Sequence, residues 1–500
     1  MFSLLILLVT INLRGVLVGV SLMMQQIKNE TLKSVFKQWS SEEGIVVINP
    51  ATEQELVRLK PSSLEELDTL IGQCKTEQVR WAKLSAKERS RRLKKWYQLL
   101  LDNAEDIATI ITLEQGKPLT ESKGEVMYGA SFVEWFSEEA KRAYGEVIPA
   151  PTTDRRLSAI RQPVGVCAAI TPWNFPIAMI TRKAAPALAA GCGMLIKPSE
   201  LTPLTAIAVV ELAYQAGIPK ELLPVVVSEQ AAEFGQVLST DPRIKKVSFT
   251  GSTRVGKILM KQASDSVKAV SMELGGNAPF IVFDDADLDA AAEGLVASKF
   301  RNAGQTCVCT NRLYVHEDVK QAFIEKVLSK LNKLQLGNGL EKGVTLGPVI
   351  TMASKHRLEA VIDQAVQEGA SIANSPQRRS GRFMEPVLLD SVKQYMSIVQ
   401  QELFGPVLPI ITFENDEQVL GMANDTEYGL ACYFYTNNFK RIVAFSEGLE
   451  YGMVGVNEGI ISTEVAPFGG VKESGVGREG AKQGLDEYLE TKYICLGGLS

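Results

Sequence analysis

Histidine is scarce in this sequence, with only His316 and His356 among 500 residues. Any general base is therefore expected to be a carboxylate, and zinc sites built on histidine are disfavoured. The 7 cysteines are odd in number, scattered, and contain no C-x-x-C pair. We expect no metal site and no disulfide framework, and we favour a reducing compartment, the cytoplasm.

An excess of positive charge is also missing. Lys and Arg total 53 against 58 Asp and Glu, for a net charge of −5. This balance gives no electrostatic argument for nucleic acid and favours a small-molecule substrate. No G-x-G-x-x-G fingerprint stands in a strand-to-helix turn, so the usual dinucleotide signature is absent. A chain of this length predicts about two or three domains.

The first 24 residues, MFSLLILLVTINLRGVLVGVSLMM, are apolar but fit no standard targeting segment. A signal peptide carries positive charge before its apolar run, and none precedes this one. Asn12 and Arg14 interrupt the segment as a membrane span. An exported leader and a membrane anchor stay open, but we favour a misassigned start, with translation from Met23 or Met24.

The remaining chain has two patterns. Helical periodicity predicts helices over 62–145, after which short apolar runs alternate with amphipathic segments. The runs that predict strands before residue 273 are 165–171, 193–199, 222–228 and 245–251. Strand–helix alternation at about thirty residues predicts βαβ units and a parallel α/β sheet, with ligands beyond the carboxyl ends of the strands.

A second α/β pattern follows residue 273. It contains the apolar runs APFIVFDD, RLYVHED, EPVLLD and VLPIITF, with helices near 318–334 and 352–369. The tail EYLETKYICLG alternates apolar and polar residues as a strand does. It has no turn partner beside it, so we expect it to pair elsewhere in the chain or with another subunit.

Polar residues follow the predicted strands. Asn174 lies between two prolines in ITPWNFP; its amide suits a developing oxyanion, and an Asx turn is the structural alternative. Lys197 and Glu200 in KPSE suit ribose hydroxyls, and a snorkelling surface lysine is the alternative. The Glu200 carboxylate would repel a ribose 2′-phosphate, which favours NAD over NADP.

Two further stretches place polar groups beside glycine. In FTGSTRVG, Gly251 and Ser252 open a predicted helix whose N–H groups suit a phosphate, although a simple capped helix has the same pattern. In ELGGN, Glu273 stands beside glycines that admit close approach. Glu273 is a candidate base, and an N-cap or a surface acid is the alternative.

The stretch FRNAGQTCVCTNR holds Cys307 and Cys309 between Arg301 and Arg312. A cysteine nucleophile needs access and a lowered thiol pKa, which nearby cations or N–H dipoles supply. Buried packing is the alternative for either cysteine.

Together these stretches resemble the aldehyde dehydrogenase superfamily. TPWNFP, KPSE, FTGSTRVG, MELGGN, GQTC, QELFGPV, NDTEYGL and PFGG occur in that family's order and spacing, over about residues 25–500. The resemblance implies three parts: a Rossmann-type NAD-binding domain, an α/β catalytic domain and a small bridging β element that pairs subunits into a homodimer or homotetramer. Their bounds would be 25–146 with 164–272, 273–473, and 147–163 with 474–500.

The resemblance also implies roles for matching residues. Cys307 would be the nucleophile, Asn174 with the Cys307 N–H the oxyanion hole, and Glu273 the base that activates water to hydrolyse a Cys307 thioester. An enzyme with this base would be non-acylating. The cofactor, NAD with NADP possible, would contact Thr171, Trp173, Lys197, Glu200, Gly251, Ser252, Gly256, Glu402 and Phe404.

Within the family, ITRK, KFRNAGQTCVC and GIIS resemble succinate-semialdehyde dehydrogenases, which serve γ-aminobutyrate (GABA) degradation. Arg182, Arg301 and Ser462 would hold the distal carboxylate of the substrate, and Phe468 would line its site. Planar guanidinium groups suit this task because they bind carboxylates bidentately. Structural ion pairs are the alternative for the arginines. Glutarate semialdehyde is the rival substrate, and a non-enzymatic, structural member of the fold is the rival function.

Cys309 is not needed for this chemistry, and packing is its simplest role. A redox switch is a second hypothesis, motivated by the spacing and by similar enzymes. A Cys307–Cys309 disulfide would be strained and easily reduced. Peroxide inactivation that dithiothreitol reverses, and that Cys309→Ala changes, would mark such a switch.

Overall fold

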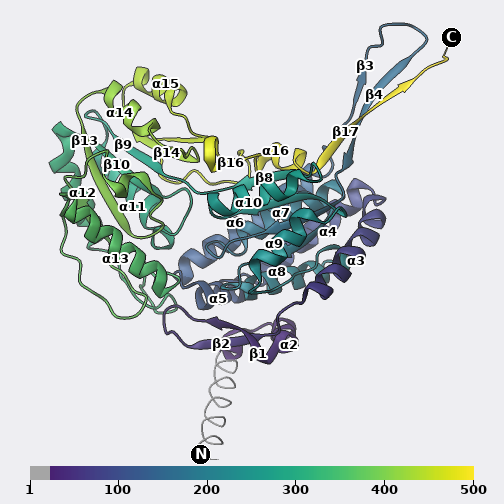
Figure 1. Ribbon diagram of the computed structural model, residues 1–500, viewed down its shortest axis with the longest axis horizontal. Coiled ribbons are helices and arrows are strands. Elements are labelled where there is room, and N and C mark those ends of the chain that lie inside the picture. The colour runs from purple at the N-terminus through teal and green to yellow at the C-terminus, as the bar shows by residue number, and fades with distance from the viewer. Residues whose placement is uncertain (1–22, 500) are drawn as a thin grey trace, which may run out of the picture.

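The computed structural model describes residues 23–499. Most of the apolar leader predicted for 1–24 lies outside these residues; Met23 and Met24 alone belong to them, and both are buried. Two lobes stand side by side, and a thin arm projects from one of them (Figure 1). Within residues 23–499, no helix combines the length and the apolar character needed to cross a membrane.

The predicted helices of the first region are confirmed. Ser63 and Ser85 accept hydrogen bonds from Glu66 N–H and Glu88 N–H and so begin two of the helices. Gly116 ends another in the left-handed region, at φ 97°. The confirmed helices are α3 (Leu64–Ala82), α4 (Ala86–Asp102), α5 (Ala104–Gln115) and α6 (Leu119–Glu139). They are preceded by α2 (Glu30–Trp39) and the strands β1 (Ser40–Ile48) and β2 (Glu55–Leu59).

The first lobe contains a five-stranded sheet in the order β16-β8-β7-β5-β6, parallel except for β16. This confirms the parallel α/β prediction. The elements are β5 (Val166–Ile170), α7 (Ala178–Ala190), β6 (Gly193–Lys197), α8 (Pro203–Gln215), α9 (Ala231–Thr240), β7 (Ile244–Thr250), α10 (Thr253–Ser264), β8 (Ala269–Glu273) and β16 (Gly475–Val476).

The strand predicted over 222–228 is wrong. The segment begins with a 3-10 turn, Lys220–Leu222, and makes only an isolated bridge between Val225 and Ile196. Pro224 accepts from Ile196 N–H but has no N–H to donate, so a regular ladder cannot form. The apolar run reflects burial rather than strand geometry.

The second lobe contains a seven-stranded sheet in the order β11-β12-β13-β10-β9-β14-β15, parallel except for β11. Its elements are β9 (Ala278–Val282), α11 (Leu288–Phe300), η2 (Arg301–Gly304), β10 (Thr310–His316), α12 (Lys320–Leu331), α13 (Met352–Gln367), β11 (Ser371–Ile372), β12 (Val387–Asp390), β13 (Val407–Phe413), α14 (Asp416–Asn424), β14 (Ala431–Tyr435), α15 (Phe439–Gly448) and β15 (Met453–Val456).

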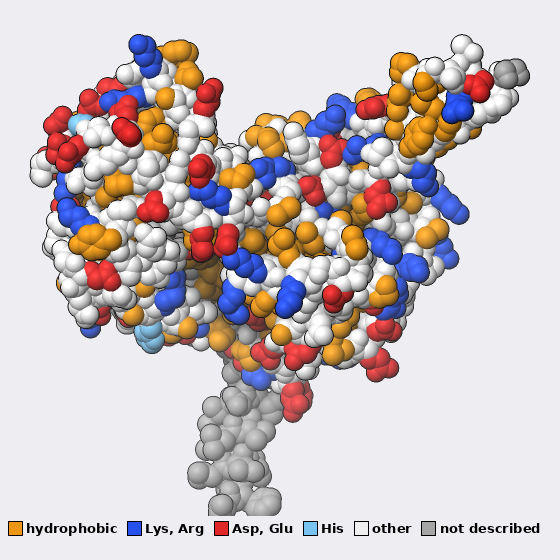
Figure 2. Space-filling model, turned by 45° about the horizontal axis from the view of Figure 1, so that its top comes forward, with side chains coloured by type: hydrophobic (Ala, Val, Ile, Leu, Met, Phe, Trp, Pro, Cys, Tyr) orange, Lys and Arg blue, Asp and Glu red, His pale blue; other side chains and the backbone are white. Residues whose placement is uncertain are grey.

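The projecting arm is an antiparallel sheet in the order β17-β4-β3. It contains β3 (Glu146–Ile148), β4 (Arg156–Pro163) and β17 (Leu489–Leu496), which follows α16 (Ala481–Asp486). The tail strand β17 therefore pairs with β4 of the same chain. This is one of the two pairings expected from the sequence. Hydrophobic side chains gather on the arm (Figure 2), and Tyr144, Val147 and Tyr493 are 75%, 87% and 60% exposed.

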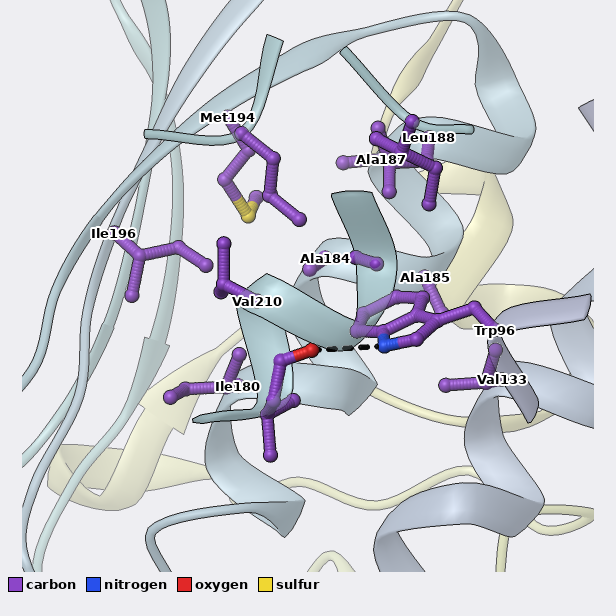
Figure 3. Close-up of a cluster of buried hydrophobic side chains, with 14 of the residues drawn as sticks. Trp96, Val133, Ile180, Ala184, Ala185, Ala187, Leu188, Met194, Ile196 and Val210 are labelled. Atoms are coloured by element: carbon purple, nitrogen blue, oxygen red, sulfur yellow. Dashed lines mark hydrogen bonds between the residues drawn. The ribbon is translucent and has the colours of Figure 1, made fainter. Parts of the chain in front are cut away.

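The core of the first lobe fixes α7, which the site depends on. Trp96 of α4 is fully buried and donates through Nε1 to Val209 O at 3.0 Å. Ala184 and Ala185 of α7, Val133 of α6 and Met194 of β6 surround this part of the core (Figure 3). Small alanine side chains allow close helix packing, so α7 is held firmly between α6 and the sheet.

Candidate active site

A cavity of about 230 Å³ opens where the carboxyl ends of β5 and β7 face the segment before β10. It brings together seven predicted site residues from distant parts of the chain. They are Trp173, Asn174, Gly251, Ser252, Cys307, Glu402 and Phe404, with Pro172, Thr250, Leu274 and Gly275 completing the lining.

Cys307, the predicted nucleophile, follows a strained turn. Asn302 and Ala303 have φ of 51° and 54°, and Gly304 follows at 73°, so the backbone is held in the left-handed region that non-glycine residues rarely adopt. Burial raises the pKa of the Cys307 thiol to about 12, although the Arg182 cation acts in the opposite direction. The thiol of the cofactor-free chain is therefore protonated at neutral pH and is a weak nucleophile.

This raised pKa predicts the pH dependence of alkylation. Iodoacetamide reacts with the thiolate, whose fraction grows about tenfold per pH unit below the thiol pKa. We expect the rate of Cys307 modification in the cofactor-free protein to rise about tenfold per unit between about pH 7 and about pH 9. Peptide mass spectrometry follows it separately from the exposed Cys495. A plateau within this range would contradict the expectation.

Asn174 is held by its backbone as well as its side chain. Its Nδ2 donates to Gln305 O at 3.1 Å, in the turn that carries Cys307. Its Oδ1 is buried without a hydrogen-bond partner. Its carbonyl accepts from Lys117 Nζ at 2.7 Å and from Asn302 Nδ2 at 3.0 Å. Asn174 is thus fixed against the cysteine turn, the position that an oxyanion donor requires.

Lys117 and Glu125 form a buried support that the sequence did not reveal. Their ion pair measures 2.5 Å, with both side chains 1% exposed. The Lys117 ammonium also lies 3.9 Å from the centroid of the Phe175 ring. Glu125 Oε1 accepts from Ile177 N–H at 3.0 Å, just before α7. No sequence motif marks Lys117, because its partners lie in other elements.

Glu273, the predicted base, ends β8 and is 3% exposed. Its Oε2 has no hydrogen-bond partner within residues 23–499. Burial, and then the nearby Glu479 carboxylate, raise the Glu273 pKa well above its ordinary value, while Arg182 and Lys183 oppose them. The same Glu479 forms ion pairs with Arg182 and Lys183. Glu479 is a second charged group that the sequence analysis missed.

The predicted substrate residues differ in their environments. Arg182 is buried, pairs with Glu479, and lies 4.3 Å from the centroid of the Phe468 ring. Arg182 therefore makes a structural ion pair through Nε, as the alternative interpretation expects. Its Nη2 is buried without a hydrogen-bond partner among the described residues. Arg301 is half-buried over the Phe175 ring at 5.1 Å. Within residues 23–499 Arg301 forms no ion pair, and Ser462 is half-buried.

The predicted dinucleotide residues lie at the carboxyl ends of the strands. Lys197 ends β6; burial lowers its pKa, and its Nζ donates only to Pro198 O, at 3.4 Å, among the described residues. Glu200 is half-buried nearby. The Oγ1 atoms of Thr171 and Thr250 are buried without partners. Two buried hydroxyls without partners among the described residues, and an ammonium with a single long hydrogen bond, fit a ligand rich in hydroxyl and phosphate oxygens.

The N-terminus of α10 and the part of the cavity wall that contains Glu402 complete the predicted dinucleotide site. Ser252 caps α10 by accepting from Val255 N–H at 3.4 Å, which leaves its O–H free to donate. A Cβ at Gly256 would approach Leu274 Cδ2 to 2.4 Å, so a larger residue there would require the Leu274 side chain to move. Glu402 accepts from Gly276 N–H at 3.1 Å, and burial raises its pKa to about 7. The residues present fit a nicotinamide dinucleotide.

The cavity has an aromatic wall, and the second cysteine lies two residues after Cys307. Trp173 and Phe404 meet edge to face, with ring centroids 5.6 Å apart. Cys309 is buried and donates to Gly304 O at 3.2 Å, and burial raises its pKa.

Arg312 is fully buried and donates to Asn277 O and Ala423 O, so it is structural. Among residues 23–499, no group of three or more His, Cys, Asp or Glu could hold a metal.

The sequence of this chain was compared with models of protein families, and the model of the aldehyde dehydrogenase family matches residues 36–494. The chain belongs to the aldehyde dehydrogenase family. This accounts for the two-lobed fold around a cysteine-bearing cavity, and it confirms the fold class that the sequence predicts.

Named aldehyde dehydrogenases are about half identical to this chain. The glutarate-semialdehyde dehydrogenase of Pseudomonas putida (strain KT2440) is 51% identical, covering 90% of this chain and 94% of its own. The NADP(+) succinate-semialdehyde dehydrogenase of Escherichia coli (strain K12) is 50% identical, covering 91% and 95%. The solved succinate-semialdehyde dehydrogenase of Burkholderia pseudomallei superposes with a TM-score of 0.90 at 48% identity, covering 91% and 95%.

Proposed function

We propose that this aldehyde dehydrogenase oxidises succinate semialdehyde to succinate, a step of GABA degradation, with NAD as the hydride acceptor. The observation that carries the proposal is the environment of Arg182. A buried guanidinium with an unpartnered Nη2 acts on the Cys307 thiol and points to a substrate that brings its own carboxylate. Relatives named for two such semialdehydes support it.

The reaction would begin at Cys307. Its thiol loses a proton to solvent, the thiolate attacks the aldehyde carbon, and the Asn174 amide with the Cys307 N–H stabilises the oxyanion of the thiohemiacetal. The bound nicotinamide supplies the hydride acceptor at this carbon. Loss of the hydride leaves a thioester on Cys307. Glu273 then takes a proton from water as the water attacks the thioester, and succinate leaves with Cys307 restored as thiolate.

The cofactor half of the proposal assigns NAD, with NADP possible. Thr171, Trp173, Lys197, Gly251, Ser252, Gly256, Glu402 and Phe404 would hold it, and Glu200 would accept from the adenosine ribose. The Glu200 carboxylate disfavours a 2′-phosphate by charge repulsion. The Escherichia coli relative is named for NADP, so the related site can accept the phosphate.

Glutarate semialdehyde is the second candidate substrate. It carries the same carboxylate on a chain one methylene longer, and one methylene contributes only about 1–3 kcal/mol of discrimination. The Pseudomonas putida relative named for this substrate supports the alternative. Comparing kcat/KM for the two semialdehydes separates them.

Replacing Arg301 tests the substrate class. We expect Arg301→Ala to raise KM for succinate semialdehyde about tenfold or more, because a charge-assisted hydrogen bond is worth about 1.5–3 kcal/mol. Steady-state NADH formation measures it, and kcat/KM for butanal, which lacks the carboxylate, is expected to stay close to that of wild type. Arg91→Ala, at a 67% exposed side chain of α4, is the control. A KM unaffected by Arg301→Ala would remove the assignment.

The arm suggests how the enzyme assembles. We infer that β3, β4 and β17 pair two chains as a homodimer or homotetramer, because Tyr144, Val147 and Tyr493 would otherwise stay exposed.

We keep the three-part domain division proposed from the sequence, and we place the enzyme in the cytoplasm because its seven cysteines form no disulfide framework. Within the described chain all seven are free.

A further inference from the structure

Tyr128 of α6 carries a buried hydroxyl that donates to no acceptor among residues 23–499. Its ring is held firmly: it meets Phe132 edge to face at 5.0 Å and packs against the cluster of Phe175, Ala178 and Met179. Buried tyrosine hydroxyls normally have a partner, because an unmade hydrogen bond costs the full desolvation of the group. If Tyr128 served packing alone, phenylalanine would satisfy the site at lower cost.

The surroundings of this hydroxyl are rich in donors. Burial raises the Tyr128 pKa, whereas the Arg182 and Arg301 cations, and a hydrogen bond from Arg182 to the phenol oxygen, act in the opposite direction. Arg182 Nη2 is itself buried without a partner. Arg301 lies over the same Phe175 ring that packs against Tyr128. The Glu479 carboxylate also acts on Tyr128, but it is already paired with Arg182 and Lys183.

The Tyr128 O–H and Arg182 Nη2 thus both lack an acceptor among the described residues, and Arg301 forms no ion pair there. A group that accepts several hydrogen bonds and carries negative charge completes such a set, and a carboxylate has this chemistry. A neutral phenol has one advantage over a third cation there. It orients the carboxylate without adding attraction for the doubly charged product, which must leave.

We propose that Tyr128 Oη donates a hydrogen bond to the distal carboxylate of the substrate, beside Arg182 and Arg301, and so determines specificity for acid-bearing aldehydes. This inference rests on the proposed function and adds a contact that the sequence motifs do not contain. No sequence motif marks this contact, because Tyr128 lies within a helix 173 residues before Arg301.

Tyr128→Phe tests the inference, because it removes one oxygen and keeps the ring. We expect KM for succinate semialdehyde to rise about tenfold, with kcat close to wild type. The inhibition constant of succinate, measured against the aldehyde, is expected to rise by a similar factor. KM and kcat for butanal stay unchanged. Tyr395→Phe, at a 77% exposed position, is the matched control.

The outcomes separate the two claims. If the wild-type enzyme does not prefer succinate semialdehyde to butanal, the proposed function fails. If it does, and Arg301→Ala abolishes the preference while Tyr128→Phe keeps the wild-type KM and succinate inhibition, only the role of Tyr128 fails. An equal loss for both aldehydes in Tyr128→Phe also overturns it, since that result marks a packing role.

Discussion

Glu273→Gln is expected to form one equivalent of NADH per site rapidly and then to turn over only slowly. The amide cannot accept the proton of the attacking water, so the thioester on Cys307 accumulates. A positioned general base contributes about 10²–10⁴-fold in rate, and we expect steady-state turnover to fall by about 10³-fold. Rapid mixing measures the NADH burst, and intact-protein mass spectrometry detects one added succinyl group.

Glu427→Gln, at an exposed glutamate, is the control and is expected to turn over normally. Turnover of Glu273→Gln within about tenfold of wild type would rule out Glu273 as the base. The wild-type enzyme provides a second readout. Burial and Glu479 raise the Glu273 pKa, so the carboxyl stays neutral to higher pH and ionises only as pH rises. The rate of thioester hydrolysis therefore increases with pH through this ionisation, and the increase is absent from Glu273→Gln.

Lys117→Met is expected to give the largest loss of stability. The substitution keeps much of the side-chain volume but leaves the Glu125 carboxylate buried without its cation. Breaking a buried ion pair from one side costs about 3–5 kcal/mol. The Asn174 carbonyl also loses its 2.7 Å donor, so kcat falls as well. Urea unfolding followed by tryptophan fluorescence and steady-state kinetics measure the two effects.

The exposed ion pair of Lys123 with Glu105 supplies the comparison, with side chains 46% and 53% exposed. Lys123→Met is expected to change stability by about 0–1 kcal/mol. Lys117→Met combined with Glu125→Gln is expected to be more stable than Lys117→Met alone, because no charge is left unpaired. Equal midpoints for Lys117→Met and Lys123→Met would show that the buried pair contributes nothing.

The sequence predicted those parts of the fold that local patterns determine. Ser63, Ser85 and Gly116 mark helix ends because their caps are local contacts. The run around Val225 misled because an apolar segment has the same composition whether it forms a ladder or a single bridge. Pro224 was the local clue against a strand.

The candidate site was predictable only where a motif surrounds the residue. Cys307 and Asn174 stand in stretches that the family shares, and the cavity contains both. Glu479, Lys117 and Tyr128 stand in no such stretch. Each gains its meaning from a partner in another element: Arg182 for Glu479, the Asn174 carbonyl for Lys117, and two distant guanidinium groups for Tyr128. These partners are set by tertiary packing, which single-sequence patterns do not encode.

The pairing of β17 with β4 also has a consequence in time. Leu496 pairs with Arg156 and Leu489 with Pro163, so the two strands are more than 300 residues apart in the chain. At about 5–20 residues per second, a ribosome needs roughly half a minute to cover that span. Throughout this interval one edge of β4 has no partner, while β3 covers the other. The sheet is completed only when β17 leaves the ribosome, so any assembly that uses it waits until residues 489–496 have been made.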